Sequence, residues 1–152
     1  MQIKQDNLRG KEIIQLLQEH LDNMIAITPP GSVHALDLDK LRLPEITFWT
    51  LWDEKNNLMG CGALKDLGDG TGEIKSMRTK EDHRGKGVAS SMLEHIISEA
   101  QERSYTHLYL ETGAFPAFKP ARTLYEKYGF NYSEPFAGYK ENSNSVFMKK
   151  EL

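Results

Sequence analysis

Residues 84–89 read Arg84-Gly85-Lys86-Gly87-Val88-Ala89. This segment follows a strand-like run at 73–79 and opens an amphipathic helix predicted from about residue 86 to residue 103. Its two glycines and its small alanine let backbone amides approach a ligand closely. The helix start adds unpaired N–H groups and the positive end of the helix dipole. Because Arg84 and Lys86 add positive charge, the segment is expected to bind a pyrophosphate.

The elements around this segment predict a mixed sheet. Strands are predicted at 2–5, 46–52, 58–64, 73–79, 105–111, 130–133 and 146–150, and helices at 8–26, 86–103 and 118–128. The strands between 46 and 79 follow one another through turns, as in an antiparallel meander. The strand–helix–strand unit 73–111 requires one parallel pair. The fold class is therefore α/β (α+β), with a mixed, mostly antiparallel sheet and helices on both faces.

The composition predicts a single soluble domain over residues 1–152, because 39% of the residues are apolar and 27% are charged. The net charge of −3 gives no overall attraction to nucleic acid or to an anionic membrane. No apolar run approaches the ~18 residues of a membrane span. The amino end lacks a secretory signal and Cys61 is the only cysteine, so a cytoplasmic location is expected. The five histidines lack metal-ligand spacing, so no metal is expected.

Two motifs resemble the GNAT family of N-acetyltransferases. Arg84-x-x-Gly87-x-Ala89 fits the family signature Arg/Gln-x-x-Gly-x-Gly/Ala, and residues 121–130 resemble the helix-to-strand segment near the carboxyl end of the family. The order and separation of the motifs also match, and the resemblance extends over the whole chain. The segments 60–64, 73–78 and 110–113 are similar to a bacterial subgroup whose substrates are mostly unassigned.

The resemblance implies a six- or seven-stranded sheet that splays between its fourth and fifth strands. Acetyl-CoA, the implied co-substrate, would place its thiol arm in the splay, and the amine acceptor would enter from the other side. A backbone amide near Met77–Thr79 would polarise the thioester carbonyl. The candidate cofactor-binding residues are Met77, Arg78, Thr79, Arg84, Gly85, Lys86, Gly87, Val88, Ala89, Ser90, Lys119, Arg122 and Tyr125. The 3′-phosphate would use Lys80, Lys86, Lys119 or Arg122, with the choice among them open.

Acetyl transfer to an amine also needs a proton donor and a base. Tyr125 is the expected donor to the CoA thiolate, because the tyrosine of the family falls at this place, and Tyr128 is the competitor. Without the motif, a helix tyrosine is ordinarily core filling. Glu73 is the first candidate base and Glu111 the second. For Glu73, a surface carboxylate at a turn is an equally good explanation.

Two further residues are candidates for contact with the acceptor. His34 lies in the irregular segment that borders the acceptor site in relatives, although a solvent-exposed histidine explains it as well. Tyr139 is a candidate wall of the same site. The substrate-binding candidates are therefore His34, Glu73, Glu111 and Tyr139.

These residues predict an enzyme that acetylates a primary amine of a small molecule by direct attack in a ternary complex. One alternative is a catalytically silent module that binds acyl-CoA, and another is an enzyme that acetylates protein amino groups. A small-molecule amine is the expected partner, without nucleic acid or membrane, and a homodimer is left open. The identity of the amine, the acyl chain length and the choice of base are also left open.

Overall fold

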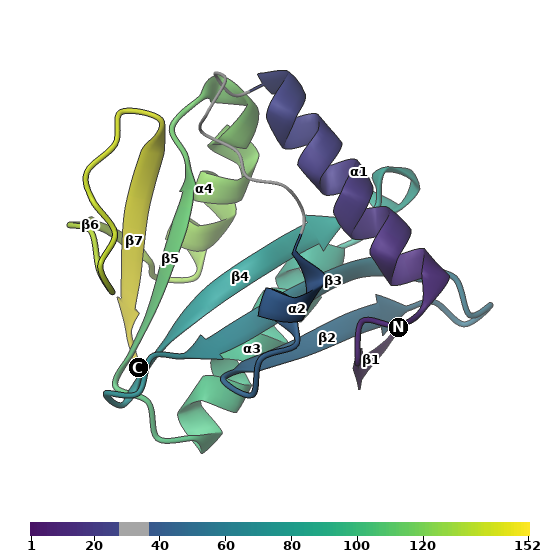
Figure 1. The fold of residues 1–152 in the computed structure, drawn as a ribbon, viewed down its shortest axis with the longest axis horizontal. Coiled ribbons are helices and arrows are strands. Elements are labelled where there is room, and N and C mark those ends of the chain that lie inside the picture. The colour runs from purple at the N-terminus through teal and green to yellow at the C-terminus, as the bar shows by residue number, and fades with distance from the viewer. Residues whose placement is uncertain (28–36) are drawn as a thin grey trace.

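The computed structural model describes residues 1–27 and 37–152, and in these residues seven strands form one sheet (Figure 1). The strands are β1 (Gln2–Gln5), β2 (Ile46–Trp52), β3 (Leu58–Asp66), β4 (Thr71–Thr79), β5 (His107–Gly113), β6 (Asn131–Ser133) and β7 (Ser145–Glu151). Their order in the sheet is β1-β2-β3-β4-β5-β7-β6. Only β4 and β5 pair in parallel among these strands. The predicted mixed sheet with one parallel pair is confirmed.

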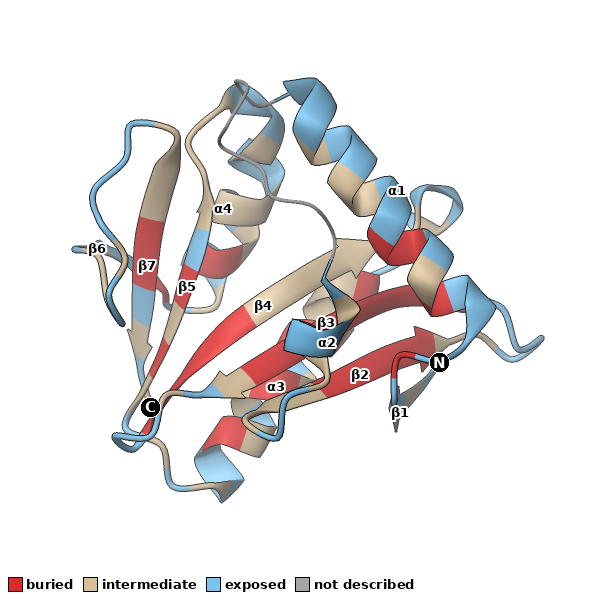
Figure 2. Ribbon diagram, in the orientation of Figure 1, coloured by how far each residue is buried: buried red, intermediate tan, exposed pale blue. Residues whose placement is uncertain are grey.

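Helices cover both faces of the sheet, as predicted. They are α1 (Lys11–Ile27), α2 (Leu38–Leu41), α3 (Val88–Glu102) and α4 (Lys119–Lys127), with short 3-10 turns η1 (Glu81–His83) and η2 (Pro116–Phe118). One buried cluster joins the apolar face of α1 to β2 and β3, and a larger cluster joins α3 and Tyr125 of α4 to the opposite face. Side chains of β3 contribute to both clusters, as the alternating pleat of a strand allows. Most of β3 is buried (Figure 2). None of the described helices is long and apolar enough to span a membrane.

Two element boundaries differ from the prediction for local reasons. The first helix begins at Lys11 rather than residue 8, because Leu8 has a left-handed backbone with φ 63° and its amide donates to Oδ1 of Asp6 at 2.7 Å. The fifth strand begins at His107 rather than residue 105, because the amide of Tyr105 still donates to the carbonyl of Ala100 at the end of α3.

The parallel pair β4–β5 opens along its length. Pairing runs from Thr71–His107 to Ile74–Leu110 and then stops, so Lys75–Thr79 of β4 has no partner strand on that side. The two ribbons diverge beyond this point (Figure 1). A bulge at Ser76, where φ is 55°, also shifts the register between β3 and β4. This splay between the fourth and fifth strands agrees with the sequence-based expectation.

Candidate active site

The glycine segment before α3 is shaped to expose backbone amides. Gly85 and Gly87 have φ values of 77° and 79°, a region that glycine adopts easily, and Gly87 is the N-cap of α3. A Cβ atom at either glycine would meet nothing within 4 Å, so both face open space. Within the part of the chain that the structure describes, no acceptor binds the amides of residues 85–90. This unpaired run at a helix N-terminus suits a phosphate group.

The cations that the sequence offers for the phosphates differ in their surroundings. Arg84 and Lys86 are exposed beside the glycine segment, where Lys86 Nζ lies 3.3 Å from Nδ1 of His83. Lys119 is also exposed, at the start of α4. Nη1 of Arg122 instead donates to the carbonyls of Gly113 and Phe115, at 2.7 and 3.0 Å. The Arg122 guanidinium is therefore held by backbone carbonyls. The lysine side chains are less constrained and are the better candidates for binding the phosphates of the coenzyme.

Tyr125 and Tyr128 of α4 have different environments. Tyr125 is only 7% exposed, packs edge-on against Phe130 at 5.7 Å, and belongs to the cluster that contains Ile74 and Leu110, the last paired residues before the splay. Burial raises the pKa of the Tyr125 phenol far above its usual value. No described residue forms a hydrogen bond with the Tyr125 hydroxyl, and the hydroxyl oxygen is not fully buried. The hydroxyl of Tyr128 donates to Glu94 Oε1 at 2.6 Å, which ties that tyrosine to α3.

Glu73 lies at the closed end of the splay in a buried polar group. Its side chain is 3% exposed, and Oε2 accepts a hydrogen bond from the hydroxyl of Tyr139 at 2.8 Å. Nζ of Lys75 lies 3.3 Å from the same Oε2 and 3.3 Å from the Tyr139 hydroxyl. No described residue forms a hydrogen bond with Oε1, and Oε1 is not fully buried. The interpretation of Glu73 as a surface carboxylate is therefore wrong.

Glu111 lies across the splay from this group. It follows Leu110, the last residue of β5 that pairs with β4, and it is exposed. Burial first, and then the charges of Glu73 and Glu111, raise the pKa of Tyr139 well above its usual value. The two candidate bases therefore flank Tyr139, and the structure brings together three of the four residues selected for acceptor contact. His34 lies outside the described residues.

Lys75 is the member of this group that the sequence analysis did not select. A signal for it exists, since residues two apart on a strand share a face and Glu73-x-Lys75 places opposite charges there. Tyr139 is held over the pair by its neighbours. Its ring lies 5.1 Å from that of Phe136 and 5.7 Å from that of Phe147.

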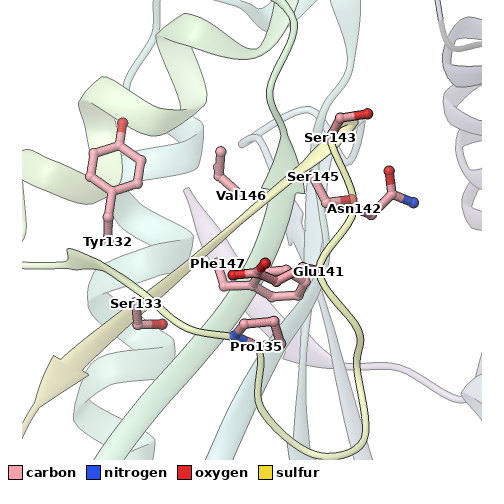
Figure 3. A pocket seen from close by; sticks show the side chains of 9 residues that line it. All are labelled: Tyr132, Ser133, Pro135, Glu141, Asn142, Ser143, Ser145, Val146 and Phe147. Carbon is pink, nitrogen blue, oxygen red and sulfur yellow. The ribbon is translucent and has the colours of Figure 1, made fainter.

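Two cavities flank the segment that carries Tyr139. One of about 410 Å³ lies between this segment and β7, and the side chains around it are shown in Figure 3. The other, of about 610 Å³, reaches Tyr109 and Phe136. Phe147, which lines the first cavity, also contacts the Tyr139 ring. Neither the glycine segment nor Tyr139 lines either cavity, so neither cavity is the expected phosphate site.

Comparison with known proteins agrees with this geometry. The model of the Acetyltransferase (GNAT) family matches residues 12–130. The chain is 57% identical to the uncharacterized N-acetyltransferase YsnE of Bacillus subtilis (strain 168), with 100% of each chain covered. It is 45% identical to the uncharacterized N-acetyltransferase YedL of Escherichia coli (strain K12), over 99% of this chain and 94% of that protein. It is also 37% identical to the IAA acetyltransferase of Azospirillum brasilense, over 92% and 90%.

Solved structures share the fold. An acyl-CoA N-acyltransferase of Klebsiella pneumoniae superposes with a TM-score of 0.80 at 26% identity, over 99% of this chain and 97% of that chain. An acetyltransferase of Bacillus subtilis in complex with CoA superposes with a TM-score of 0.72 at 19% identity, over 99% and 98%. The chain therefore belongs to the GNAT acetyltransferase family, and it is an acetyl-CoA-dependent N-acetyltransferase.

Proposed function

We propose that residues 1–152 act as one domain that transfers the acetyl group of acetyl-CoA to a primary amine of a small-molecule acceptor. The observation that carries the proposal is the run of unpaired amides at 85–90, which follows β4, the strand that separates from β5, after the short turn η1. The pyrophosphate binds these amides with Ser90 as a further donor, and the thiol arm follows the free edge of β4.

Direct attack of the amine accounts for the residues in the splay. A backbone amide near Met77–Thr79 stabilises the negative charge that develops on the thioester oxygen. Glu73 or Glu111 accepts the proton of the amine, directly or through water, and Tyr125 gives its proton to the departing thiolate. The C–S bond breaks as the C–N bond forms, so the products are the amide and CoA.

A covalent acetyl-cysteine intermediate does not fit the chain. Burial raises the pKa of the Cys61 thiol to about 12, and the side chain is 1% exposed. The thiol donates to the carbonyl of Ser76 at 3.2 Å. A thiol in this state is not a nucleophile at neutral pH, because the thiolate is the reactive form. A ternary complex is therefore the simpler route.

An acceptor screen that measures release of the CoA thiol tests this function. The panel holds amino acids, polyamines, aminoglycosides, short peptides and IAA, the last because the Azospirillum brasilense relative is named for it. We expect release with at least one small amine. Tight binding of acetyl-CoA without release from any amine would support a silent binding module, and release only with peptides would support a protein acetyltransferase.

Replacing Gly87 by Val tests the pyrophosphate site. Valine is strained at the φ of 79° that Gly87 adopts, so the substitution should turn the amides at 85–90 away from the ligand. We expect the Kd for acetyl-CoA to rise by about 10-fold or more, since one strained residue costs roughly 1–2 kcal/mol. Isothermal titration calorimetry measures the change. Gly68→Val, at a similar φ of 81° in the turn before β4, is the matched control and should leave the Kd unchanged.

A further inference from the structure

Arg78 extends from β4 on the face of the sheet that α1 covers. It pairs in register with Cys61 of β3, and residues paired across strands share a face. Cys61 belongs to the cluster beneath α1, whereas Met77 packs against the cluster on the α3 face. The side chain of Arg78 therefore lies on the face that α1 covers, together with Glu73 and Lys75; this is called the acceptor face below. The glycine segment leads into α3 on the opposite face.

Among the described residues, Arg78 has no counter-ion in direct contact. No described residue forms an ion pair or hydrogen bond with its guanidinium, and Nε is sealed from solvent without a partner. The Nη groups are not among the sealed atoms, so they are open to a ligand. Burial, and then the charge of Arg84, lower the pKa of Arg78, and Cys61, Glu19 and Glu81 only partly offset this. An arriving anion would relieve the imbalance.

His20 of α1 lies beside Arg78 and has the same deficiency. Its Nδ1 is buried and has no hydrogen-bond partner among the described residues. Burial, and then the charge of Arg78, lower the pKa of His20 to about 4, so the imidazole is neutral at pH 7. Nε of Arg78 on β4 and Nδ1 of His20 on α1 thus lie close together, and neither has a hydrogen-bond partner among the described residues. Lys75, the neighbouring cation on this strand, is already paired with Glu73.

We propose that the acceptor is an amine that also carries a carboxylate, as an amino acid does, and that Arg78 beside His20 binds this carboxylate. The inference rests on the proposed function. A guanidinium recognises a carboxylate through two parallel hydrogen bonds. Arg78 lies within Met77–Thr79, the part of β4 at which the thioester carbonyl is expected, so an amine bound next to its carboxylate there would lie near the reacting carbonyl. A phosphate of the coenzyme shares the anionic chemistry, so the test must separate the two ligands.

The test compares L-amino acids with their amides as acceptors, in the wild type and in Arg78→Gln. We expect the wild type to favour the acids, and the variant to raise KM for the acids by about 10- to 100-fold. The acid-to-amide ratio of kcat/KM, which a general loss of activity or of coenzyme binding would leave unchanged, should fall by the same factor. Arg78→Lys keeps the charge without the planar fork and should fall between the two. Arg9→Gln, at an exposed site before α1, is the control and should match the wild type.

Each failure has a distinct meaning. Equal use of acids and amides by the wild type would overturn the carboxylate subsite and leave the acetyltransferase function intact. A 10-fold weaker binding of acetyl-CoA by both Arg78 variants would also overturn it, because Arg78 would then contact a coenzyme phosphate. Absence of CoA release with every acid, amide and polyamine would instead refute the proposed function itself.

Discussion

Tyr125→Phe is expected to lower kcat by about 100-fold or more, which is the usual contribution of a positioned general acid. Without the hydroxyl, the thiolate of CoA must leave unprotonated. Burial keeps the pKa of the phenol far above its usual value, so the proton is present throughout the working pH range. The ring remains in its core position, so the Kd for acetyl-CoA should barely change. Steady-state release of the CoA thiol, with calorimetry alongside, measures both quantities.

Tyr128→Phe provides the matched control three residues further along α4. The hydroxyl of Tyr128 is engaged by Glu94, so its loss should leave kcat near the wild-type value. If Tyr125→Phe kept wild-type turnover across the pH range, Tyr125 would have no part in the chemistry. If only Tyr128→Phe lost turnover, the donor would have to be reassigned to Tyr128.

Glu73→Gln combined with Glu111→Gln is expected to lower kcat/KM by about 100-fold at a pH below 7, the range in which a general base matters most. An acceptor amine with a pKa near ~10 is then almost fully protonated. Because the free amine becomes more abundant as pH rises, the deficit of the double variant should shrink at high pH. A pH–rate profile for each acceptor measures this change.

The single variants identify the base. Glutamine keeps the shape of Glu73 and retains an oxygen that accepts the hydrogen bond from Tyr139, so the fold should tolerate it. A loss confined to Glu73→Gln assigns the base to the buried carboxylate, and a loss confined to Glu111→Gln assigns it to the exposed one. Full activity of the double variant below pH 7 would eliminate a carboxylate base altogether.

Much of the fold follows from local patterns in the sequence. The alternating and β-rich runs give β1 and β2 with the predicted bounds, and the glycine-rich turns separate the meander strands. The glycine segment at 84–89 was also predicted from its own residues, because backbone shape and helix start are local properties. Helix and strand ends were less accurate. The left-handed turn at Leu8 and the hydrogen bond from Tyr105 to Ala100 at the end of α3 set these boundaries. The spacing of apolar residues does not predict either feature.

The acceptor face was harder to predict because it is formed by contacts between residues that are far apart in the sequence. Glu73 and Tyr139 are 66 residues apart, and their hydrogen bond depends on a turn in which Ala137 and Gly138 have φ values of 48° and 82°. The position of Arg78 beside His20, where neither has a partner among the described residues, depends on which face of β4 lies under α1. The face that Arg78 takes is set by the bulge at Ser76, which the sequence alone does not reveal.

A crystal structure of the protein with acetyl-CoA is the most direct test of the account. We expect oxygens of the pyrophosphate at about 2.7–3.2 Å from the amides of residues 85–90, with the thiol arm along Lys75–Thr79 of β4. The Tyr125 hydroxyl should face the sulfur. A pyrophosphate bound anywhere else on the chain would contradict the account, because every role assigned to the splay depends on that anchor.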